Sequence, residues 1–397
     1  MKIFAFFAAA LAVAVPQAAA KPGHAVPVMA LAEHGSTSSL VKLDGMTLEP
    51  LSAQIPLGPG ATVLARSPVG GRVAVATGNN SWLRFADLSR LRAGTYLYLG
   101  GYGEAALWTQ PTRLVVLIGG ESGYLKVIDT RRNRLVRSRL LGGQVIATAR
   151  TPSALVLLLA PPGQLGPARL AVVDGSARVR TVALRGIQAG WAAVMDGANP
   201  VVHADVPGLA VDPSGKRAAV VTASGAGATV ELATLSVRSY ESRTLARARK
   251  EVRGAVLSAT WFAPNLIAVT GEDAVGDEEW TPRGLKILDT RDWTMRLVDR
   301  GVTSTALAGE TLLAFGAVWD WHTNAWVAGA GVSGFDAAGS SQYHLFGSTP
   351  IDSLTTVGSW AYVGSGGGRH FTVVDAAAGV VAGEAATAVP TSIVGAW

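Results

Sequence analysis

The sequence predicts an all-β protein, a β-propeller of four-stranded blades whose ring is closed where the C-terminal strand joins the N-terminal blade. A strand–turn–strand phrase recurs along the chain, and short period-two apolar runs fill the intervals between its copies. The composition agrees, because 49% hydrophobic residues, 16% charged residues and 47 glycines are typical of a well-buried protein with many tight turns.

The first residues of the chain predict an export signal. Lys2 precedes the apolar run IFAFFAAALAVAV, and the small residues Ala18, Ala19 and Ala20 follow it. These are the three parts of a secretory signal peptide. We therefore expect cleavage near Ala20, a single propeller domain over 21–397, and a secreted or periplasmic protein. The run is too short to span a bilayer comfortably, so stable membrane insertion is not expected.

The recurring phrase is an apolar run that ends in Asp, then a polar turn and a second run, as in YLKVIDTRRNRLV at 124–136. Eight copies place these residues at the Asp position: Asp44, Asp87, Asp129, Asp174, Thr234, Asp289, Asp336 and Asp375. Units of about 40–50 residues with four short strands each are typical of propeller blades. The count predicts eight blades, or seven if the degenerate unit at 331–346 is irregular.

The remaining strands of each blade lie between these copies. In GLAVDPSGKRAAVVT, at 208–222, two apolar runs flank a turn in which Pro213 presets one φ angle and Gly215 accepts the left-handed position. The first unit lacks an innermost strand, whereas the chain ends with the lone strand TSIVGAW at 391–397. Joining the two completes the first blade and leaves no open sheet edge.

The repeats LKVIDTRRNRLVRSRLLGG, LAVVDGSARVRTVAL and GLAVDPSGKRAAVVT resemble those of YVTN-type and WD-repeat-like propellers of exported bacterial proteins. The resemblance implies the fold and a habit of ligand binding, since the family includes binding proteins, lactonase-like enzymes and subunits of quinoprotein dehydrogenases. It carries no catalytic motif. Trp-Asp dipeptides are missing from the repeat ends, and Thr234 replaces Asp in the fifth unit. Function must therefore be argued from a site.

The repeated Asp itself predicts structure rather than chemistry. A carboxylate at the end of a strand can accept the backbone N–H groups of the following turn. An active site needs one special place, whereas this Asp recurs in seven of the eight units.

The longest connections indicate the binding face. They lie at 160–168, 186–205, 271–283 and 317–331, and strand counting puts all four on the face opposite the Asp turns, in blades four to seven. Loops held by a rigid scaffold often carry function. We expect a monomer that recognises a protein, peptide or glycan ligand on this face.

These connections contain the candidate binding residues. Trp319, Trp321 and Trp326 could stack on a sugar or a peptide, because aromatic faces bury a large area at little entropy cost. Alternatively, they pack their loop onto the blade.

Two His–carboxylate pairs lie in the same connections. His203 stands two residues from Asp205, and Asp320 two residues from His322. Such ligands suit zinc or another divalent metal, and the acidic cluster at 273–279 suits calcium. Neither spacing is diagnostic of a metal site, so solvated polar side chains are the alternative.

Other function classes lack support. The G-x-S-x-G, H-E-x-x-H and P-loop signatures are absent. The absence of cysteine excludes disulfides, thiolate metal sites and a Cys nucleophile. The net charge of +6 without a run of Lys and Arg argues against nucleic-acid binding.

The sequence therefore favours a binding protein without a cofactor over an enzyme. The alternative is a lactonase-like or other metal-assisted hydrolase. In that enzyme, His203, Asp205, Asp320 and His322 would surround the mouth of the central channel.

Overall fold

The computed structural model describes residues 25–69, 71–196, 199–241, 252–275, 279–320, 323, 325–365 and 367–397. The predicted signal peptide lies outside these residues. Within them the chain forms strands and turns without any helix, so the all-β prediction is confirmed. The described residues accordingly include no helix long and apolar enough to cross a membrane.

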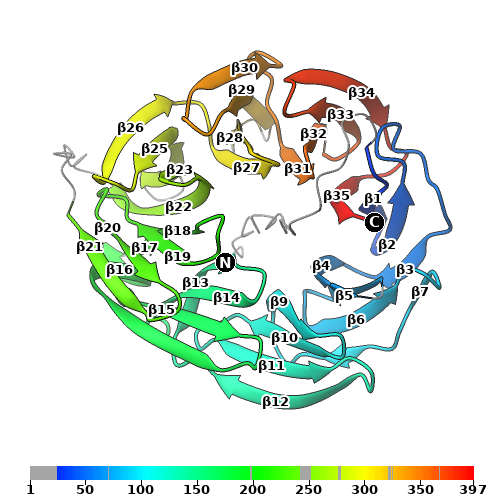
Figure 1. The fold of residues 1–397 in the computed structure, drawn as a ribbon, viewed down its shortest axis with the longest axis horizontal. Coiled ribbons are helices and arrows are strands. Elements are labelled where there is room, and N and C mark those ends of the chain that lie inside the picture. The colour runs from blue at the N-terminus through cyan, green and yellow to red at the C-terminus, as the bar shows by residue number, and fades with distance from the viewer. Residues whose placement is uncertain are drawn as a thin grey trace.

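The strands form sheets that stand around a common centre like the blades of a propeller (Figure 1). One blade combines β1 (Val28–His34), β2 (Thr37–Leu43) and β3 (Ile55–Gly58) with the C-terminal strand β35 (Thr391–Ala396). The next contains β4 (Thr62–Arg66), β5 (Arg72–Thr77), β6 (Trp82–Asp87), β7 (Arg92–Ala93) and β8 (Leu97–Tyr98). A third contains β9 (Gly103–Gln110), β10 (Arg113–Ile118), β11 (Tyr124–Asp129) and β12 (Arg134–Leu140).

Three more four-stranded sheets are separate blades. The first contains β18 (Gly208–Val211), β19 (Arg217–Val221), β20 (Gly227–Glu231) and β21 (Ser236–Tyr240). The second contains β27 (Ser304–Ala308), β28 (Thr311–Asp320), β29 (Ala325–Phe335) and β30 (Ser341–Leu345). The third contains β31 (Ser353–Val357), β32 (Trp360–Ser365), β33 (His370–Asp375) and β34 (Val380–Ala386).

The remaining ten strands form one continuous sheet that contains two four-stranded groups. The first group is β13 (Gln144–Arg150), β14 (Ala154–Ala160), β15 (Gly166–Asp174) and β16 (Val179–Asp196). The second is β22 (Val252–Ala263), β23 (Leu266–Val275), β25 (Leu285–Asp289) and β26 (Thr294–Asp299). β17 (Asn199–Val206) pairs with β16 and β22 and so joins the groups, and β24 (Glu279–Pro282) pairs with β23.

The two ends of the described chain meet in one blade. β35 pairs antiparallel with β1, from Val28 opposite Ala396 to Ala32 opposite Thr391, with a bulge after Met29. β35 therefore occupies the innermost position of that blade, beside the centre of the ring (Figure 1).

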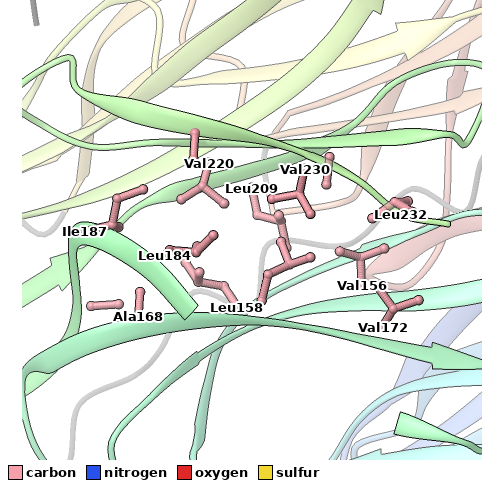
Figure 2. Close-up of a cluster of buried hydrophobic side chains, with 14 of the residues drawn as sticks. Val156, Leu158, Ala168, Val172, Leu184, Ile187, Leu209, Val220, Val230 and Leu232 are labelled. Carbon is pink, nitrogen blue, oxygen red and sulfur yellow. The ribbon is translucent and has the colours of Figure 1, made fainter. Parts of the chain in front are cut away.

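The hydrophobic core lies between the blades. The close-up in Figure 2 shows one cluster, in which Val156 and Leu158 of β14 and Leu184 of β16 face Val220 of β19 and Val230 of β20. All five side chains are buried. Seven further clusters of this kind are found among the described residues. Since both faces of a blade are covered, its strands contain runs of consecutive apolar residues, as in ALVLLLA of β14.

The recurring Asp has the structural role that the sequence predicts. Asp87 Oδ1 accepts the backbone N–H groups of Ser89 and Arg90, and where Thr234 replaces Asp, its hydroxyl accepts the N–H of Ser236. Asp44, Asp129, Asp174, Asp289, Asp336 and Asp375 accept N–H bonds from their own turns in the same way.

These Asp turns also connect neighbouring blades. At Gly45, Thr130 and Ala376, each the residue after a repeated Asp, the carbonyl accepts a side-chain hydrogen bond from the blade beside it. Arg72 donates to Thr130 at 3.2 Å, and the Tyr343 hydroxyl donates to Ala376 at 2.7 Å. In these three turns, the Asp thus holds a turn whose carbonyl contacts the neighbouring blade.

The ring formed by the blades has two sides, and each strand connection lies on one or the other. The first residue of an innermost strand pairs with the last residue of its neighbour, as Gln144 with Ala160 and Gly208 with Val221. The connections that follow these neighbours, including 160–168, 271–283 and 317–331, therefore lie on one face, here called the loop face. The Asp turns lie on the opposite face, because Asp129 pairs with Arg113 at the start of β10.

Candidate binding face

The connections predicted as long loops are mostly extended hairpins. β16 continues to Asp196 and returns as β17, β23 continues to Val275 and returns as β24, and β28 and β29 extend past the blade to Asp320 and from Ala325. Only 160–168 consists largely of turn, before β15 begins. The expectation of irregular loops is therefore corrected. Extending the strands pairs backbone N–H and C=O groups that a long loop would leave to solvent.

Two of the hairpins combine into one sheet on the loop face. β17 pairs in parallel with β22 through Ala204, Asp205 and Val206, and β22 pairs onward with β23 and β24. We call this sheet the platform: 190–196 of β16, then β17, 252–257 of β22, 270–275 of β23, and β24. The platform connects the two groups of the ten-stranded sheet across the β18–β21 blade.

Gly254 permits the junction at the middle of the platform. It has a φ of +155° and pairs with Ala204. A Cβ at this position would collide with the backbone of Ala204. The parallel pairing of β17 with β22 therefore requires glycine here.

His203 and Asp205 lie on one face of β17, since residues two apart point the same way in a strand. Both are partly buried, and the Asp205 carboxyl has no hydrogen bond or ion pair among the described residues. Burial raises the pKa of the Asp205 carboxyl to about 6. This perturbed carboxyl is the strongest chemical feature of the predicted set.

The other predicted residues belong to the β28–β29 hairpin. Trp319 pairs with Trp326 through the backbone, and Asp320 pairs with Ala325. Trp321 and His322 lie outside the described residues.

One residue of the acidic cluster at 273–279, Asp273, has a structural role. Asp273 forms an ion pair with Arg283, whose guanidinium also donates to the Ala223 carbonyl at 2.8 Å. Residues 276–278 lie outside the described part of the chain. Among the described residues, no group of three or more His, Asp or Glu side chains is placed to hold a metal.

Two further ionisable groups are perturbed near this ion pair. Burial raises the pKa of Glu272, and burial together with the charge of Arg283 lowers the pKa of Lys286. Glu272 lies on the opposite side of β23 from Asp273. The two carboxylates therefore do not form one site.

A hollow of about 500 Å³ lies on the opposite face, where β25 and β26 meet the turn after Asp336. Its charged side chains bind each other or the backbone. Arg291 is paired with Asp289, and Arg296 donates to the Gly339 carbonyl. Because these groups are already engaged, the loop face offers the better candidate site.

The predictions missed a group of exposed aromatic side chains on the loop face. Trp82, Tyr96 and Tyr98 are 42%, 49% and 60% exposed. Each lies in an ordinary blade rather than in a long connection. The sequence does indicate this group, because the segment YLYLGGY at 96–102 contains three tyrosines.

Comparison with known structures defines the class of protein. The dihydro-heme d1 dehydrogenase NirN, solved in complex with DHE, has a TM-score of 0.60 at 13% identity, covering 95% of this chain and 77% of NirN. Apo AztD from Citrobacter koseri has a TM-score of 0.50 at 12% identity, covering 94% of this chain and 98% of AztD. Both are β-propeller proteins, and so is this chain.

At identities this low, the likeness shows the fold alone. No protein-family model matches the chain, and a search of curated proteins finds no relative. The function must therefore be argued from the loop face itself.

Proposed function

We propose that this protein is an exported β-propeller that binds a segment of a partner protein on its loop face, with the platform as the recognition surface. The observation that carries the proposal is the pair of unpartnered edges of the platform. Among the described residues, β24 pairs only with β23, and residues 192–196 of β16 pair in the sheet only with β17.

An unpaired strand edge presents a row of backbone N–H and C=O groups. A segment in extended conformation adds to such an edge as a further strand, with main-chain hydrogen bonds supplying affinity. The two edges differ, because β24 ends at Pro282, which has no N–H to donate. We therefore propose the 192–196 edge as the main docking edge.

The ring supplies the rigidity that such recognition needs. The cluster in Figure 2 includes Leu184 and Ile187, so β16 is anchored in a core just before it enters the platform. A preorganised edge loses less conformational entropy on binding than a mobile loop would.

The variant Gly254→Ala tests this function, because it disturbs the platform junction and leaves the blade cores intact. Peptides would be selected from a random display library on the full chain, and their binding measured by calorimetry. We expect selected peptides to protect the amides of 192–196 from hydrogen exchange and to bind Gly254→Ala at least tenfold more weakly.

The matched control is Gly301→Ala, where a Cβ meets no atom closer than 3.4 Å. It should bind like the parent protein. The proposal fails if no peptide is selected, or if selected peptides bind Gly254→Ala as tightly as the control.

Trp319, Trp321 and Trp326 are proposed as additional contacts for the same partner. Tryptophan is enriched among the residues that dominate interface energetics. Replacing the three by Ala should weaken the selected peptides further. Unchanged affinity would assign them to packing of their own hairpin.

We further propose that the ring has eight blades of YVTN-like repeats. Support comes from the two four-stranded groups within the ten-stranded sheet and from the eight core clusters, each of which joins residues of adjacent groups. Closure through β35 and β1 completes the eighth interface. A seven-fold ring in electron micrographs of the purified protein would contradict this count.

Export is proposed from the sequence of residues 1–20. Intact-mass analysis of protein recovered from an exporting host should give a chain that begins at Lys21. A mass that retains Met1 would contradict it.

A metal-assisted hydrolase is the second candidate, and Asp205 favours it. A carboxyl with a pKa raised to about 6 beside His203 has the protonation behaviour of a general acid or base. Metal analysis of the purified protein, followed by lactone and ester hydrolysis assays on Asp205→Asn, tests it. Equal hydrolysis by parent and variant would exclude Asp205 as the catalytic group.

A further inference from the structure

Three exposed aromatic rings form a surface cluster at the edge between two blades. The rings of Trp82 and Tyr98 are 4.8 Å apart between centroids, and those of Trp82 and Tyr96 are 6.3 Å apart and nearly perpendicular. All three remain between 42% and 60% exposed. We call these three residues the aromatic cluster.

The cluster is on the loop face. Trp82 is the first residue of β6 and pairs with Thr77 across the β5–β6 turn and with Tyr98 of β8 on its other side. This turn is equivalent to those that carry the extended hairpins. The cluster belongs to the β4–β8 blade, whereas the platform belongs to the ten-stranded sheet, so the two surfaces are separate.

The rings are held in place despite their exposure. The Tyr96 hydroxyl donates to the Leu57 carbonyl at 3.1 Å, and the Arg84 guanidinium lies 4.3 Å from the centroid of the Tyr96 ring. Arg84 also donates to the carbonyls of Leu57 at 2.7 Å and Gly94 at 2.9 Å. Its charge is therefore engaged from several sides, and the ring is fixed before any ligand arrives.

Glycine lets the backbone approach the rings closely. A Cβ at Gly58 would lie 2.8 Å from the Tyr96 hydroxyl oxygen, and a Cβ at Gly78 would lie 3.1 Å from the Trp82 ring. Both glycines have positive φ, so a side chain at either position is disfavoured twice.

The segments that form the cluster carry no charged side chain, and the two cations beside it, Arg84 and Lys126, are bound to backbone carbonyls. Three segments supply it and its neighbours: IPLGPGATVLA at 55–65, VAVATGNNSWL at 73–83 and AGTYLYLGGYG at 93–103. None contains Asp, Glu, Lys, Arg or His. Because the neighbouring cations already donate to carbonyls of the protein and the three segments add no charge, this surface suits an uncharged ligand.

We propose that the aromatic cluster binds a neutral glycan. The faces of aromatic rings carry negative partial charge, and the C–H bonds on a sugar ring carry positive partial charge, so the two stack. Sugar hydroxyls also need hydrogen-bond partners. Within the described residues, the Trp82 indole N–H and the Tyr98 hydroxyl bind no protein group and are available as donors.

Calorimetry with three neutral hexasaccharides, cellohexaose, maltohexaose and chitohexaose, tests the proposal on the full chain. We expect at least one to bind, with quenching of tryptophan fluorescence. Tyr98→Ala and Trp82→Ala should each weaken that binding at least tenfold. Tyr98→Phe, which keeps the ring and loses the hydroxyl, should weaken it less.

Tyr124→Ala is the matched control. Tyr124 is the first residue of β11, the equivalent of Trp82 in the next blade, is 41% exposed, and contacts no other ring among the described residues. It should bind sugar like the parent protein. Thermal melting within a few degrees of the parent would show that the variants are folded.

Three results would overturn the proposal: none of the hexasaccharides binds, a sugar binds Tyr98→Ala and Trp82→Ala as well as the parent, or the cluster binds poly-L-proline or an alginate hexamer in place of neutral sugar. Gly254→Ala should retain sugar binding, because the cluster does not depend on the platform. The peptide experiment and the glycan experiment can therefore fail independently.

Discussion

At the scale of a residue, the carboxyl group of Asp205 is partly buried and has no partner among the described residues. The unfolded chain ionises an Asp near pH 4, whereas burial holds the pKa of Asp205 at about 6 in the folded protein. The folded state therefore binds the proton more tightly. The contribution of Asp205 to the free energy of unfolding therefore falls as pH rises from about 4 to about 6, and above that range this contribution no longer changes with pH.

We expect Asp205→Asn to raise the thermal stability at pH 8 and to leave it unchanged at pH 4. The amide cannot ionise, so the cost of burying a charge disappears, with a gain of about 1–3 kcal/mol. Differential scanning calorimetry at the two pH values measures this. Glu310→Gln, at an exposed turn, is the control. An equal effect of Asp205→Asn at both pH values would contradict the assignment.

At the scale of elements, the turn after each Asp joins two strands, and at Gly45, Thr130 and Ala376 it also presents a carbonyl to the neighbouring blade. In the β6–β7 turn, Asp87 Oδ1 accepts N–H groups from Ser89 at 3.1 Å and Arg90 at 3.0 Å. Hydrogen bonds from the Ser89 hydroxyl and from these N–H groups outweigh burial and lower the pKa of Asp87. The stabilisation is present above about pH 4 and is lost as pH falls through the lowered pKa.

We expect Asp87→Ala to destabilise the protein by about 1–2 kcal/mol at pH 7, because two backbone donors lose their acceptor. Asp87→Asn keeps an acceptor oxygen and should lose less. Thermal unfolding at pH 7 and pH 3 separates the two effects, since the difference between parent and Asp87→Asn should shrink in acid. Identical behaviour of the Ala and Asn variants would show that Asp87 is not a turn acceptor.

The whole molecule depends on completing the blade that both ends of the described chain share. β35 supplies its innermost strand, and Ile393 of β35 is buried with residues of β1 and β33. Without this strand, β1 would present an open edge to the centre of the ring.

We expect Ile393→Ala to destabilise the fold by about 2–4 kcal/mol, the usual cost of truncating a buried Ile. The control Val381→Ala, 46% exposed on the outermost strand β34, should cost less than about 0.5 kcal/mol. Melting temperatures and limited proteolysis compare the two. Equal losses would mean that the β1–β35 junction does not limit the stability of the ring.

Much of this architecture could be predicted because it is local. The alternation in YLKVID and the polar turn after Asp129 specify a hairpin within about a dozen residues, and the structure has that hairpin as β11 and β12. The placement of the long connections on one face also followed from counting such hairpins. Their strand conformation was missed because glycine and polar residues within 186–205 and 271–283 favour a loop prediction.

The candidate site was less predictable, because its contacts join distant parts of the chain. His203 and Asp205 were selected by residue type. That Asp205 lies beside Ala255 of β22, and that Asp273 is occupied by Arg283, depend on pairings absent from the local pattern. The aromatic cluster was missed for the same reason, since Trp82 and Tyr98 meet only when β8 pairs with β6.

The sequence alone determined the repeated hairpins of the blades, the Asp turns, and the face on which the long connections lie, because each depends on side-chain alternation and turn chemistry within a few residues. Only the tertiary structure decided that β17 and β22 join into a platform and that three neutral segments converge on one exposed surface. These contacts join segments that are far apart in the sequence. They depend on how neighbouring blades are placed relative to one another, which no local sequence pattern specifies.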